Sequence, residues 1–495
     1  MLLEDAVLPV LETLYLLCLL GLAVYGLNNL VTTILYLRSR QRKRPPRPAM
    51  SLRDWPRVTV QLPTFNERYT VERLIHAVAR LDYPHSLLQI QVLDHSTDDT
   101  TLLVQRLVEQ YQAQGLDIAL IHRSDRQGFK AGALNAGLKS ATGELIALFD
   151  ADFAPERDWL QHAVPEFQDP KLGCLQTRWG HLNNQYSPFT RAQALGIDGH
   201  FIIEQTARSR CGLFMNFNGT AGIWRRACIE GAGGWQSDTL TEDLDLSYRA
   251  QIRGWRVGYL PDVVVPGELP ALVETFKHQQ FRWAKGSFQT VRKLVPALLK
   301  AEVPWYVRLM GLVHITGYFV HPLMLLILLL ILPLGLYDSR FLRMFPWTAF
   351  AAFGPPLLYL CARSEYAPRL RDRLSLLPLL TLIGFGLCLN NTVAVLQGIL
   401  GRQRGTFVRT PKFNLTNHKD PLGANGYAIP ISPMVWGEVA MLLYTFVILY
   451  LLPAHTGAGI IPWVMAYTAG FAYMIGLNLL EHLQLSRLHP VAAKA

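Results

Sequence analysis

Two aspartates lie one residue apart directly after a short apolar run. The segment 149–155 reads FDADFAP, so Asp150 and Asp152 both reach the same side of a turn. Hard divalent cations take carboxylate oxygens together with substrate phosphates. A bound Mg²⁺ or Mn²⁺ at this pair would neutralise a diphosphate leaving group as a Lewis acid. Two aspartates at this spacing also occur by chance in many proteins, so the motif depends on where it lies in the fold.

A second acidic cluster opens a helical pattern at 240–255, which reads LTEDLDLSYRAQIRGW. Thr241 is a candidate N-cap, and acids in a first helical turn are stabilising on their own account. Glu242 or Asp243 could instead be the base that takes a proton from an acceptor hydroxyl, which requires hydrogen-bond reach. The residues alone leave both interpretations open.

A third segment, HQQFRWAKGSF (278–288), combines amides, cations and a tryptophan just before a long apolar region. At a membrane border, such a segment can be an interfacial aromatic with snorkelling cations. The acids upstream favour a functional role for Gln279, Arg282 and Trp283 instead.

The elements that must position these residues alternate in type. The pattern predicts strands at 57–63, 89–94, 116–121 and 144–150 and helices at 70–80, 99–114 and 130–139. This alternation is typical of a mostly parallel, doubly wound sheet, in which ligands bind outside the carboxyl ends of the strands. Asn66, Glu67 and Asp94 fall at such ends, as do the two aspartates above, although a turn-forming role is common for Asp in loops.

The glycines of GFKAGALNAG (128–137) exclude two nucleotide-binding fingerprints, because their spacing fits neither GxGxxG nor GxxxxGK[ST]. Lys130 could still meet a phosphate near the start of that helix, where backbone N–H groups favour anions. The alternative is a solvated lysine.

Composition places the chain in a membrane. Half of its 495 residues are hydrophobic and 17% are charged, with apolar residues gathered at 8–37 and across 306–480. The first block is long enough to span a bilayer, and it lacks the basic head of a signal peptide. The basic cluster RSRQRKRPPR (38–47) follows it and puts the next domain in the cytosol by the positive-inside rule. The cluster accounts for much of the net charge of +10. Polybasic residues beside a membrane span usually contact anionic lipid head groups, so the charge does not indicate nucleic-acid binding.

Further spans are expected at 319–336, 345–361, 434–452 and 460–480. The apolar stretch 374–400 contains Asn390 and Asn391 and precedes a basic segment, so we expect it to be interfacial or re-entrant. The protein is then expected in the cell membrane or an inner membrane, with its N-terminus on the outer side and its C-terminus in the cytosol. The six cysteines are dispersed without metal-ligand spacing, and we expect them to be reduced.

Taken together, the motifs resemble those of the processive family 2 glycosyltransferases, and of cellulose-synthase-like proteins of the mannan and glucan synthase-like branch in particular. The segments that carry the resemblance are TFNE (64–67), VLDHSTDD (92–99), KAGALN (130–135), DAD (150–152), FNGTAG (217–222), TED (241–243) and QQFRW (279–283). His95 stands where relatives often have a second acid.

The resemblance implies a GT-A fold, Rossmann-like, and inverting transfer from a nucleotide sugar. Asp243 would be the general base, with Glu242 and Arg282 also catalytic, and Asp150 and Asp152 would hold Mg²⁺ or Mn²⁺. The implied donor-binding residues are Thr64, Asn66, Glu67, Asp94, Lys130, Asp150, Gln279, Arg282, Thr410 and Lys412. The implied acceptor-binding residues are Asn218, Gly219, Thr220 and Trp283. Thr410 and Lys412 belong to TFVRTPKF (406–413), which resembles a gating loop that closes over the donor.

These observations divide the chain into five parts: a transmembrane helix at 1–37, a basic linker at 38–54, the GT-A domain at 55–300, membrane and interfacial helices with the loop 401–424 at 301–486, and a tail at 487–495. Our first hypothesis is a synthase that elongates a β-linked polysaccharide from UDP-glucose, or next GDP-mannose, and passes it through the membrane. A lipid glycosyltransferase with a diacylglycerol- or ceramide-type acceptor is the alternative, and a receptor for nucleotide sugars is a third. The expected partners are the donor, a glycan or lipid acceptor and membrane lipids.

Overall fold

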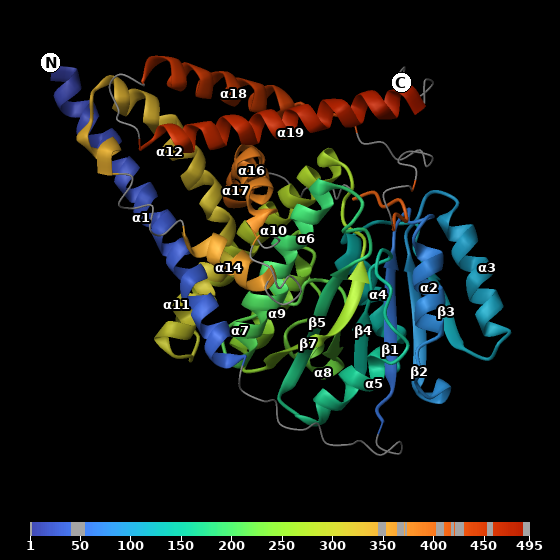
Figure 1. The fold of residues 1–495 in the computed structure, drawn as a ribbon. Helices are drawn as coiled ribbons and strands as arrows, with labels where there is room; N and C mark the ends of the chain where they lie inside the picture. Colours follow the sequence, from blue (N-terminus) through green and yellow to red (C-terminus); the bar gives the residue numbers. More distant parts are fainter. Residues whose placement is uncertain are drawn as a thin grey trace.

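The computed structural model of the chain describes residues 2–40, 55–344, 353–363, 371, 374–401, 410–416, 420, 430–452 and 459–488. A domain built on one sheet lies beside a group of long apolar helices, and helices α6, α7, α9 and α10 lie between these two parts (Figure 1). This arrangement confirms the expected α/β GT-A-like domain joined to apolar helices.

The sheet has seven strands in the order β3-β2-β1-β4-β6-β5-β7. Its strands are β1 (Val58–Thr64), β2 (Leu88–Asp94), β3 (Asp117–His122), β4 (Leu145–Leu148), β5 (Leu172–His181), β6 (Gly222–Arg225) and β7 (Arg256–Gly267). The first four strands are parallel as predicted, and β5 is parallel to β7. Strand β6 is antiparallel to β4 and β5, so the sheet is mixed, which the expectation of a mostly parallel sheet did not include.

Strand β1 lies between β2 and β4 and is buried on both faces. Val58, Val60 and Leu62 are fully buried in one core cluster. On the opposite face, the buried Gln61 side chain donates from Nε2 to Gln91 Oε1 at 3.0 Å, which pairs the two amides inside the sheet. Strands that are buried on both faces are typical of sheets covered by helices on both sides.

The helices between the parallel strands cover both faces of the sheet. They are α2 (Val71–Ala79), α3 (Thr100–Gln112) and α4 (Phe129–Ser140), within two residues of the predicted bounds. Residues of α2 and α3 pack in one core cluster, whereas those of α4 pack in another. The sheet is therefore doubly wound, and the ends of its parallel strands meet at one edge.

Later helices of this domain complete the site. They are α5 (Trp159–Ala163), α6 (Pro188–Asp198), α7 (Thr206–Arg210), α8 (Arg226–Gly231), α9 (Glu242–Ile252) and α10 (Val273–Lys300). A π-helical segment, η4 (Gly199–Gln205), joins α6 to α7 without a break. Short π-helical insertions of this kind are frequent at functional sites.

The apolar helices account for the membrane part. They are α1 (Leu2–Ser39), α11 (Trp305–Ile315), α12 (Val320–Leu336), α14 (Gly354–Arg363), α16 (Leu377–Gly386), α17 (Cys388–Leu400), α18 (Met434–Leu451) and α19 (Ile461–Leu488). Among the described residues, four stretches are long and apolar enough to span a membrane: Val7–Ser39, Gly317–Leu336, Met434–Leu451 and Ile461–Ser486. They agree with four of the expected spans. Residues 345–352 of the span expected at 345–361 and most of the loop 401–424 lie outside the described residues.

Helices α16 and α17 are bent by 49° relative to one another, as in a broken span or a re-entrant loop. The polar residues near this break are held by neighbouring helices: Asn390 Nδ2 donates to Lys277 O at 3.2 Å, and Asn391 Nδ2 lies 2.9 Å from His321 Nε2. Irregular apolar segments are tolerated in a membrane where protein satisfies their polar groups. The expectation that 374–400 does not cross the bilayer stays a prediction.

The cysteines are consistent with the expected reduced state. Four of them are buried free thiols, namely Cys18, Cys174, Cys228 and Cys388. Buried thiols of this kind behave as small apolar packing groups.

Candidate active site

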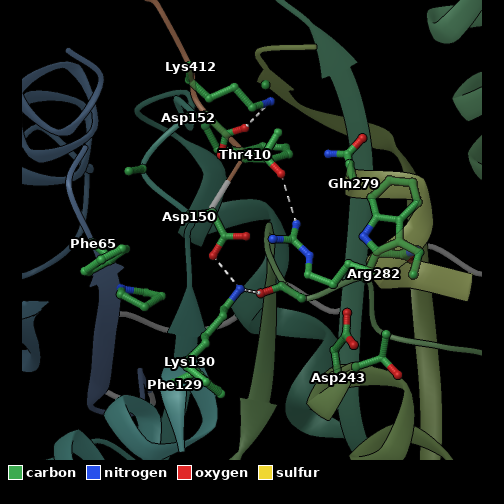
Figure 2. A pocket seen from close by; sticks show the side chains of 18 of the residues that line it. Phe65, Phe129, Lys130, Asp150, Asp152, Asp243, Gln279, Arg282, Thr410 and Lys412 are labelled. Carbon is green, nitrogen blue, oxygen red and sulfur yellow. Dashed lines mark hydrogen bonds and ion pairs between the residues drawn. The ribbon is translucent and has the colours of Figure 1, made fainter. Parts of the chain in front are cut away.

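A cavity of about 230 Å³ lies at the carboxyl ends of β1 and β4, the edge where the sequence predicted a ligand site (Figure 2). Most residues expected at the site line this cavity: Thr64, Glu67, Lys130, Asp150, Asp152, Asn218, Gly219, Glu242, Asp243, Gln279, Arg282, Trp283, Thr410 and Lys412. They come from the sheet edge, from α4, α9 and α10, and from a segment near residue 410. The fold thus gathers chemistry-bearing residues from distant parts of the sequence.

The two aspartates of the DAD segment each contact a lysine. Asp150 Oδ1 contacts Lys130 Nζ, which also donates to Gly219 O at 3.0 Å. Asp152 Oδ2 lies 2.8 Å from Lys412 Nζ. These lysines place positive charge beside both carboxylates, where a diphosphate and a cation could be bound together.

Thr220 fixes the turn that carries Asp150. Its Oγ1 accepts a hydrogen bond from Asp150 N at 2.8 Å, and the residue is fully buried. The structure therefore places this expected acceptor-binding residue behind the cavity wall, where it supports Asp150.

Glu242 and Asp243 form the start of α9 at the opposite side of the cavity. Within the described part of the chain, neither carboxylate forms an ion pair, and Asp243 Oδ1 accepts a hydrogen bond from Leu244 N at 2.8 Å. Burial raises the pKa of both carboxyl groups, and the charge of Asp243 raises the pKa of Glu242 further. A buried carboxylate with a raised pKa is suited to accept a proton near neutral pH.

The start of α9 is held against α10 by a close backbone approach. A Cβ atom at Gly286 would lie 2.5 Å from Thr241 Cγ2, so a side chain at this position would separate the two helices. The absence of a side chain at Gly286 brings the α9 acids and the α10 residues to one cavity.

Helix α10 presents Gln279, Arg282 and Trp283 to the cavity. Their spacing of three and four residues puts them on one helical face. Arg282 Nη2 donates to Thr410 Oγ1 at 3.3 Å, so the segment near residue 410 closes the cavity over this arginine (Figure 2). Trp283 offers a ring face of the kind that packs on a sugar.

Two expected donor-binding residues lie behind the cavity. The Asp94 carboxylate is fully buried, accepts from Ser96 N and Thr101 Oγ1, and lies 2.8 Å from His122 Nδ1. Asn66 adopts a φ of 55° and joins the same loop through its own bonds to Ser96 and Thr97. Their positions favour a role in shaping the loop after β2, where His95 lines the cavity instead.

Sequence reasoning missed several residues of the cavity wall. Trp179 and His181 come from the end of β5, and Phe65 follows β1. The Arg126 guanidinium lies 3.7 Å from the centre of the Phe65 ring, forming a cation–π contact. The run TRWGH after an apolar segment was the available signal for β5, because Thr177, Trp179 and His181 recur there at every second position, which is the strand spacing.

The comparison with family models decides the class of this domain. Residues 56–286 match the model described as glycosyltransferase like family 2. The chain carries a family 2 glycosyltransferase domain.

Several curated relatives of this glycosyltransferase domain are plant proteins. It is 41% identical over 252 residues to glucomannan 4-beta-mannosyltransferase 2 of Arabidopsis thaliana, a match covering 50% of this chain and 47% of the relative. It is 42% identical over 254 residues to probable glucomannan 4-beta-mannosyltransferase 11 of Oryza sativa subsp. japonica, covering 50% of this chain and 44% of the relative. The chain thus spans about half the length of the curated relatives it matches.

A solved structure shows the same fold. The mannosyltransferase from Pyrobaculum calidifontis, solved in complex with GDP-Man and Mn²⁺, superimposes with a TM-score of 0.53 at 24% sequence identity. The match covers 79% of this chain and 100% of that chain. At this identity the likeness supports the GT-A-like fold of the glycosyltransferase domain.

The donor set of the glycosyltransferase domain fits a divalent cation that takes most of its ligands from substrate and water. Within the described residues, no group of three His, Cys, Asp or Glu side chains could form an all-protein site. Asp150 and Asp152 supply carboxylate oxygens at the cavity wall. Mg²⁺ is commonly bound by one or two carboxylates plus phosphates and water, which is the composition these residues allow.

Proposed function

We propose that the chain is an inverting mannosyltransferase that transfers mannose from GDP-mannose to the end of a growing β-linked polysaccharide. One observation carries the proposal: a single cavity brings the DAD aspartates, the α9 acids and the α10 arginine and tryptophan together. The names of the plant relatives support the sugar and the acceptor.

The choice of donor follows the relatives. Of the two donors considered from the sequence, UDP-glucose came first and GDP-mannose second, and the relatives' names reverse that order. The base-binding part of the cavity includes Phe65 and Arg126, whose planar groups can stack on a nucleobase.

The cavity's cations hold the diphosphate of the donor. Lys130 and Arg282 both line the cavity, and each has a fixed protein contact that sets its direction. Asp150 and Asp152 would hold Mg²⁺ or Mn²⁺, which as a Lewis acid stabilises negative charge on the leaving diphosphate. Lys412 contacts Asp152 and adds positive charge from the segment near residue 410.

Asp243 is the base of the reaction in this proposal. Its carboxylate takes the proton of the acceptor hydroxyl as that oxygen forms a bond to the anomeric carbon of mannose. The bond from that carbon to the phosphate oxygen breaks, and GDP leaves with the electron pair. Gly219 lies against Asp243, since a Cβ at this glycine would be 3.0 Å from Asp243 Oδ2. The loop implied to bind the acceptor therefore abuts the base.

The membrane helices have a role in the same proposal. The glycosyltransferase domain faces the cytosol, the N-terminus lies outside, and the product passes outward between the chain's own helices. The basic cluster at 38–47 and the apolar helices support this orientation. Trp283 receives the end of the polysaccharide at the start of that path.

The test uses the purified chain in detergent with Mn²⁺ or Mg²⁺ and radiolabelled GDP-mannose or UDP-glucose. We expect label from GDP-mannose in insoluble material that a β-mannanase digests, dependent on the added cation. Label confined to an organic extract would make the acceptor a lipid and contradict polysaccharide synthesis. Incorporation from UDP-glucose alone would overturn the donor.

A further inference from the structure

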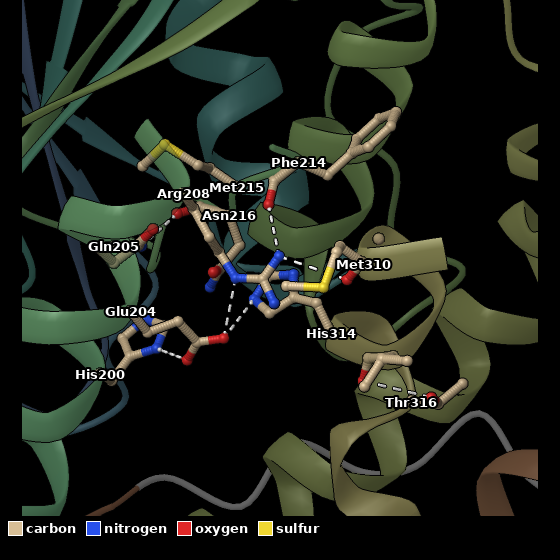
Figure 3. Close-up of polar contacts among 12 residues, drawn as sticks. His200, Glu204, Gln205, Arg208, Phe214, Met215, Asn216, Met310, His314 and Thr316 are labelled. Carbon is tan, nitrogen blue, oxygen red and sulfur yellow. Dashed lines mark hydrogen bonds and ion pairs between the residues drawn. The ribbon is translucent and has the colours of Figure 1, made fainter. Parts of the chain in front are cut away.

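A cluster of polar side chains lies behind the acceptor side of the cavity, where the π-helical segment η4, α7 and α11 meet (Figure 3). This Glu204 cluster consists of His200, Glu204, Gln205, Arg208 and His314. Its members have no direct place in the reaction proposed above, because none of them lines the cavity. The cluster is therefore a feature that the function has not yet explained.

The cluster contains a buried ion pair. The Arg208 side chain is 0% exposed, and its Nε donates to Glu204 Oε1 at 2.9 Å. Its Nη1 donates to Phe214 O at 3.1 Å, and within the described residues its Nη2 has no acceptor. Burying a charged pair costs desolvation energy that its attraction often only balances. An ordinary hydrophobic core would serve stability as well, so the pair's contacts indicate another use.

Hydrogen bonds connect Glu204 through His200 to Asn218 in the wall of the cavity. Glu204 Oε2 lies 2.8 Å from His200 Nδ1, and Asn218 Nδ2 lies 3.1 Å from His200 Nε2. A carboxylate can only accept and an amide nitrogen can only donate. The Nδ1 nitrogen of His200 therefore carries a proton directed at Glu204, and its Nε2 contacts the Asn218 amide, 3.1 Å from Nδ2 and 3.5 Å from Oδ1.

Gln205 fixes the other end of the same amide. Its Nε2 donates to Asn218 Oδ1 at 2.8 Å. His200 and Gln205 are five residues apart, which is the hydrogen-bonding period of a π-helix. The π-helical form of η4 thus lets both side chains reach Asn218 from one segment.

Asn218 lines the cavity next to Gly219, the residue against Asp243. With one N–H on His200 and one lone pair of its oxygen on Gln205, the amide keeps one donor and one acceptor. A sugar hydroxyl is both a donor and an acceptor and can use these two groups.

We propose that Glu204 and His200 are positioning residues for sugar transfer, which hold the Asn218 amide in one orientation for a hydroxyl of the acceptor sugar. This inference rests on the proposed function, since it assigns the polysaccharide acceptor to the Asn218 side of the cavity. Arg208 and His314 extend the same cluster to α11, because Arg208 Nη1 also lies 3.4 Å from Met310 O and His314 Nε2 lies 3.9 Å from Glu204 Oε1.

The test compares E204Q with E230Q. Glu230 forms an exposed ion pair with Arg226 at the same four-residue spacing, so it is a matched control outside the Glu204 cluster. The E204Q side chain can turn its amide nitrogen toward His200 Nδ1, so that two donors face each other and the hydrogen bond between the two side chains is lost. We expect E204Q to raise the KM for β-mannan oligosaccharides about tenfold, with the KM for GDP-mannose within about twofold of wild type. E230Q should change neither constant.

A second variant distinguishes the loss of this positioning from misfolding. H200Q removes the link to Asn218 while leaving the Glu204–Arg208 pair in place, and it should raise the same KM. Combining E204Q with N218A should add little to N218A alone, because both changes act through one amide. Equal losses for donor and acceptor with a lowered melting temperature, or independent effects in the double variant, would show a merely structural role and overturn the proposal.

Hydrogen exchange separates this inference from the proposed function. We expect faster amide exchange at 217–222 in E204Q and H200Q and unchanged exchange in E230Q. If wild type transfers no mannose, the proposed function fails, while faster exchange in these variants alone still supports the orienting role of Glu204. Unchanged exchange at 217–222 in both variants would overturn that role whatever the activity.

Discussion

Two pairs of neighbouring carboxylates face the same cavity in opposite surroundings. Asp150 and Asp152 each contact a lysine, whereas Glu242 and Asp243 form no ion pair within the described residues. Burial raises the pKa of Glu242 and Asp243 and also that of Asp150, where the contacting charge of Lys130 opposes the rise. In the proposed reaction the first pair shares positive charge with a diphosphate and the second takes up a proton. The placement of the lysines would then separate charge neutralisation from proton transfer within one cavity.

The largest effect should come from the second pair. D243N keeps the shape of the side chain but cannot accept a proton, so we expect mannose transfer to fall about 10³-fold. The affinity for GDP, measured by isothermal titration, should stay within about twofold of wild type. D238N changes an exposed aspartate that pairs with Lys293 and is the control. Retained transfer in D243N would move the base to Glu242.

The lysine of the first pair should be next. K130M removes the charge that contacts Asp150 and keeps the length of the side chain. In the proposed reaction Lys130 stabilises charge on the leaving diphosphate, so we expect kcat/KM to fall about 10²-fold. GDP binding should weaken as well, in contrast to D243N. A K130M variant with normal GDP affinity would place the diphosphate elsewhere.

The lysine near residue 410 should matter less. K412M removes the contact with Asp152, while Arg282 and Lys130 remain. One lost charged contact predicts about a tenfold rise in the KM for GDP-mannose, with kcat little changed, in steady-state kinetics. K139M, at an exposed position on α4 and outside the cavity wall, is the comparison. A larger loss in kcat than in KM would show that this segment also acts in the chemical step.

The smallest effect is a shift in pH dependence. Asp243 must be ionised to act, so kcat/KM should fall as pH drops through its pKa, which burial places above the ordinary value of about 3.9. The positive charge of Lys130 lowers the pKa of Asp243 and opposes this rise. K130M removes that charge, so the acid limb of the kcat/KM profile should move to higher pH in this variant. A shift to lower pH would contradict the effect of Lys130 on the base.

The sequence predicted the parallel half of the sheet well for a physical reason. Strand β1 has apolar residues at every second position, and α2 has apolar residues at helical spacing, so both patterns stand out locally. Strand β6 covers only Gly222–Arg225 and pairs antiparallel with strands far away in sequence. No local pattern carries that pairing, and Trp179 and His181 on the neighbouring β5 were missed with it.

The site residues divide in the same way, into those that belong to short sequence motifs and those whose contacts depend on the tertiary fold. Residues that belong to short motifs, such as Asp150 and Trp283, line the cavity, and their roles stay predictions. Asp94 was expected at the donor because of its motif, yet its carboxylate is buried under the loop that it shapes. The Glu204 cluster could not be predicted, since it depends on a π-helical segment and on a buried arginine whose partners come from separate elements.

Polar contacts join helix α10 to the apolar helices α18 and α19. Lys277 Nζ lies 2.7 Å from Glu438 Oε1 on α18, and Glu274 Oε2 accepts from Asn478 Nδ2 on α19 at 2.9 Å. The same helix carries Trp283 farther along. A bilayer whose thickness does not match the apolar helices tilts them at a modest energetic cost. We therefore expect the transfer rate to depend on lipid chain length. The rate should be greatest in a bilayer whose thickness matches the apolar helices, so that α10 is not displaced.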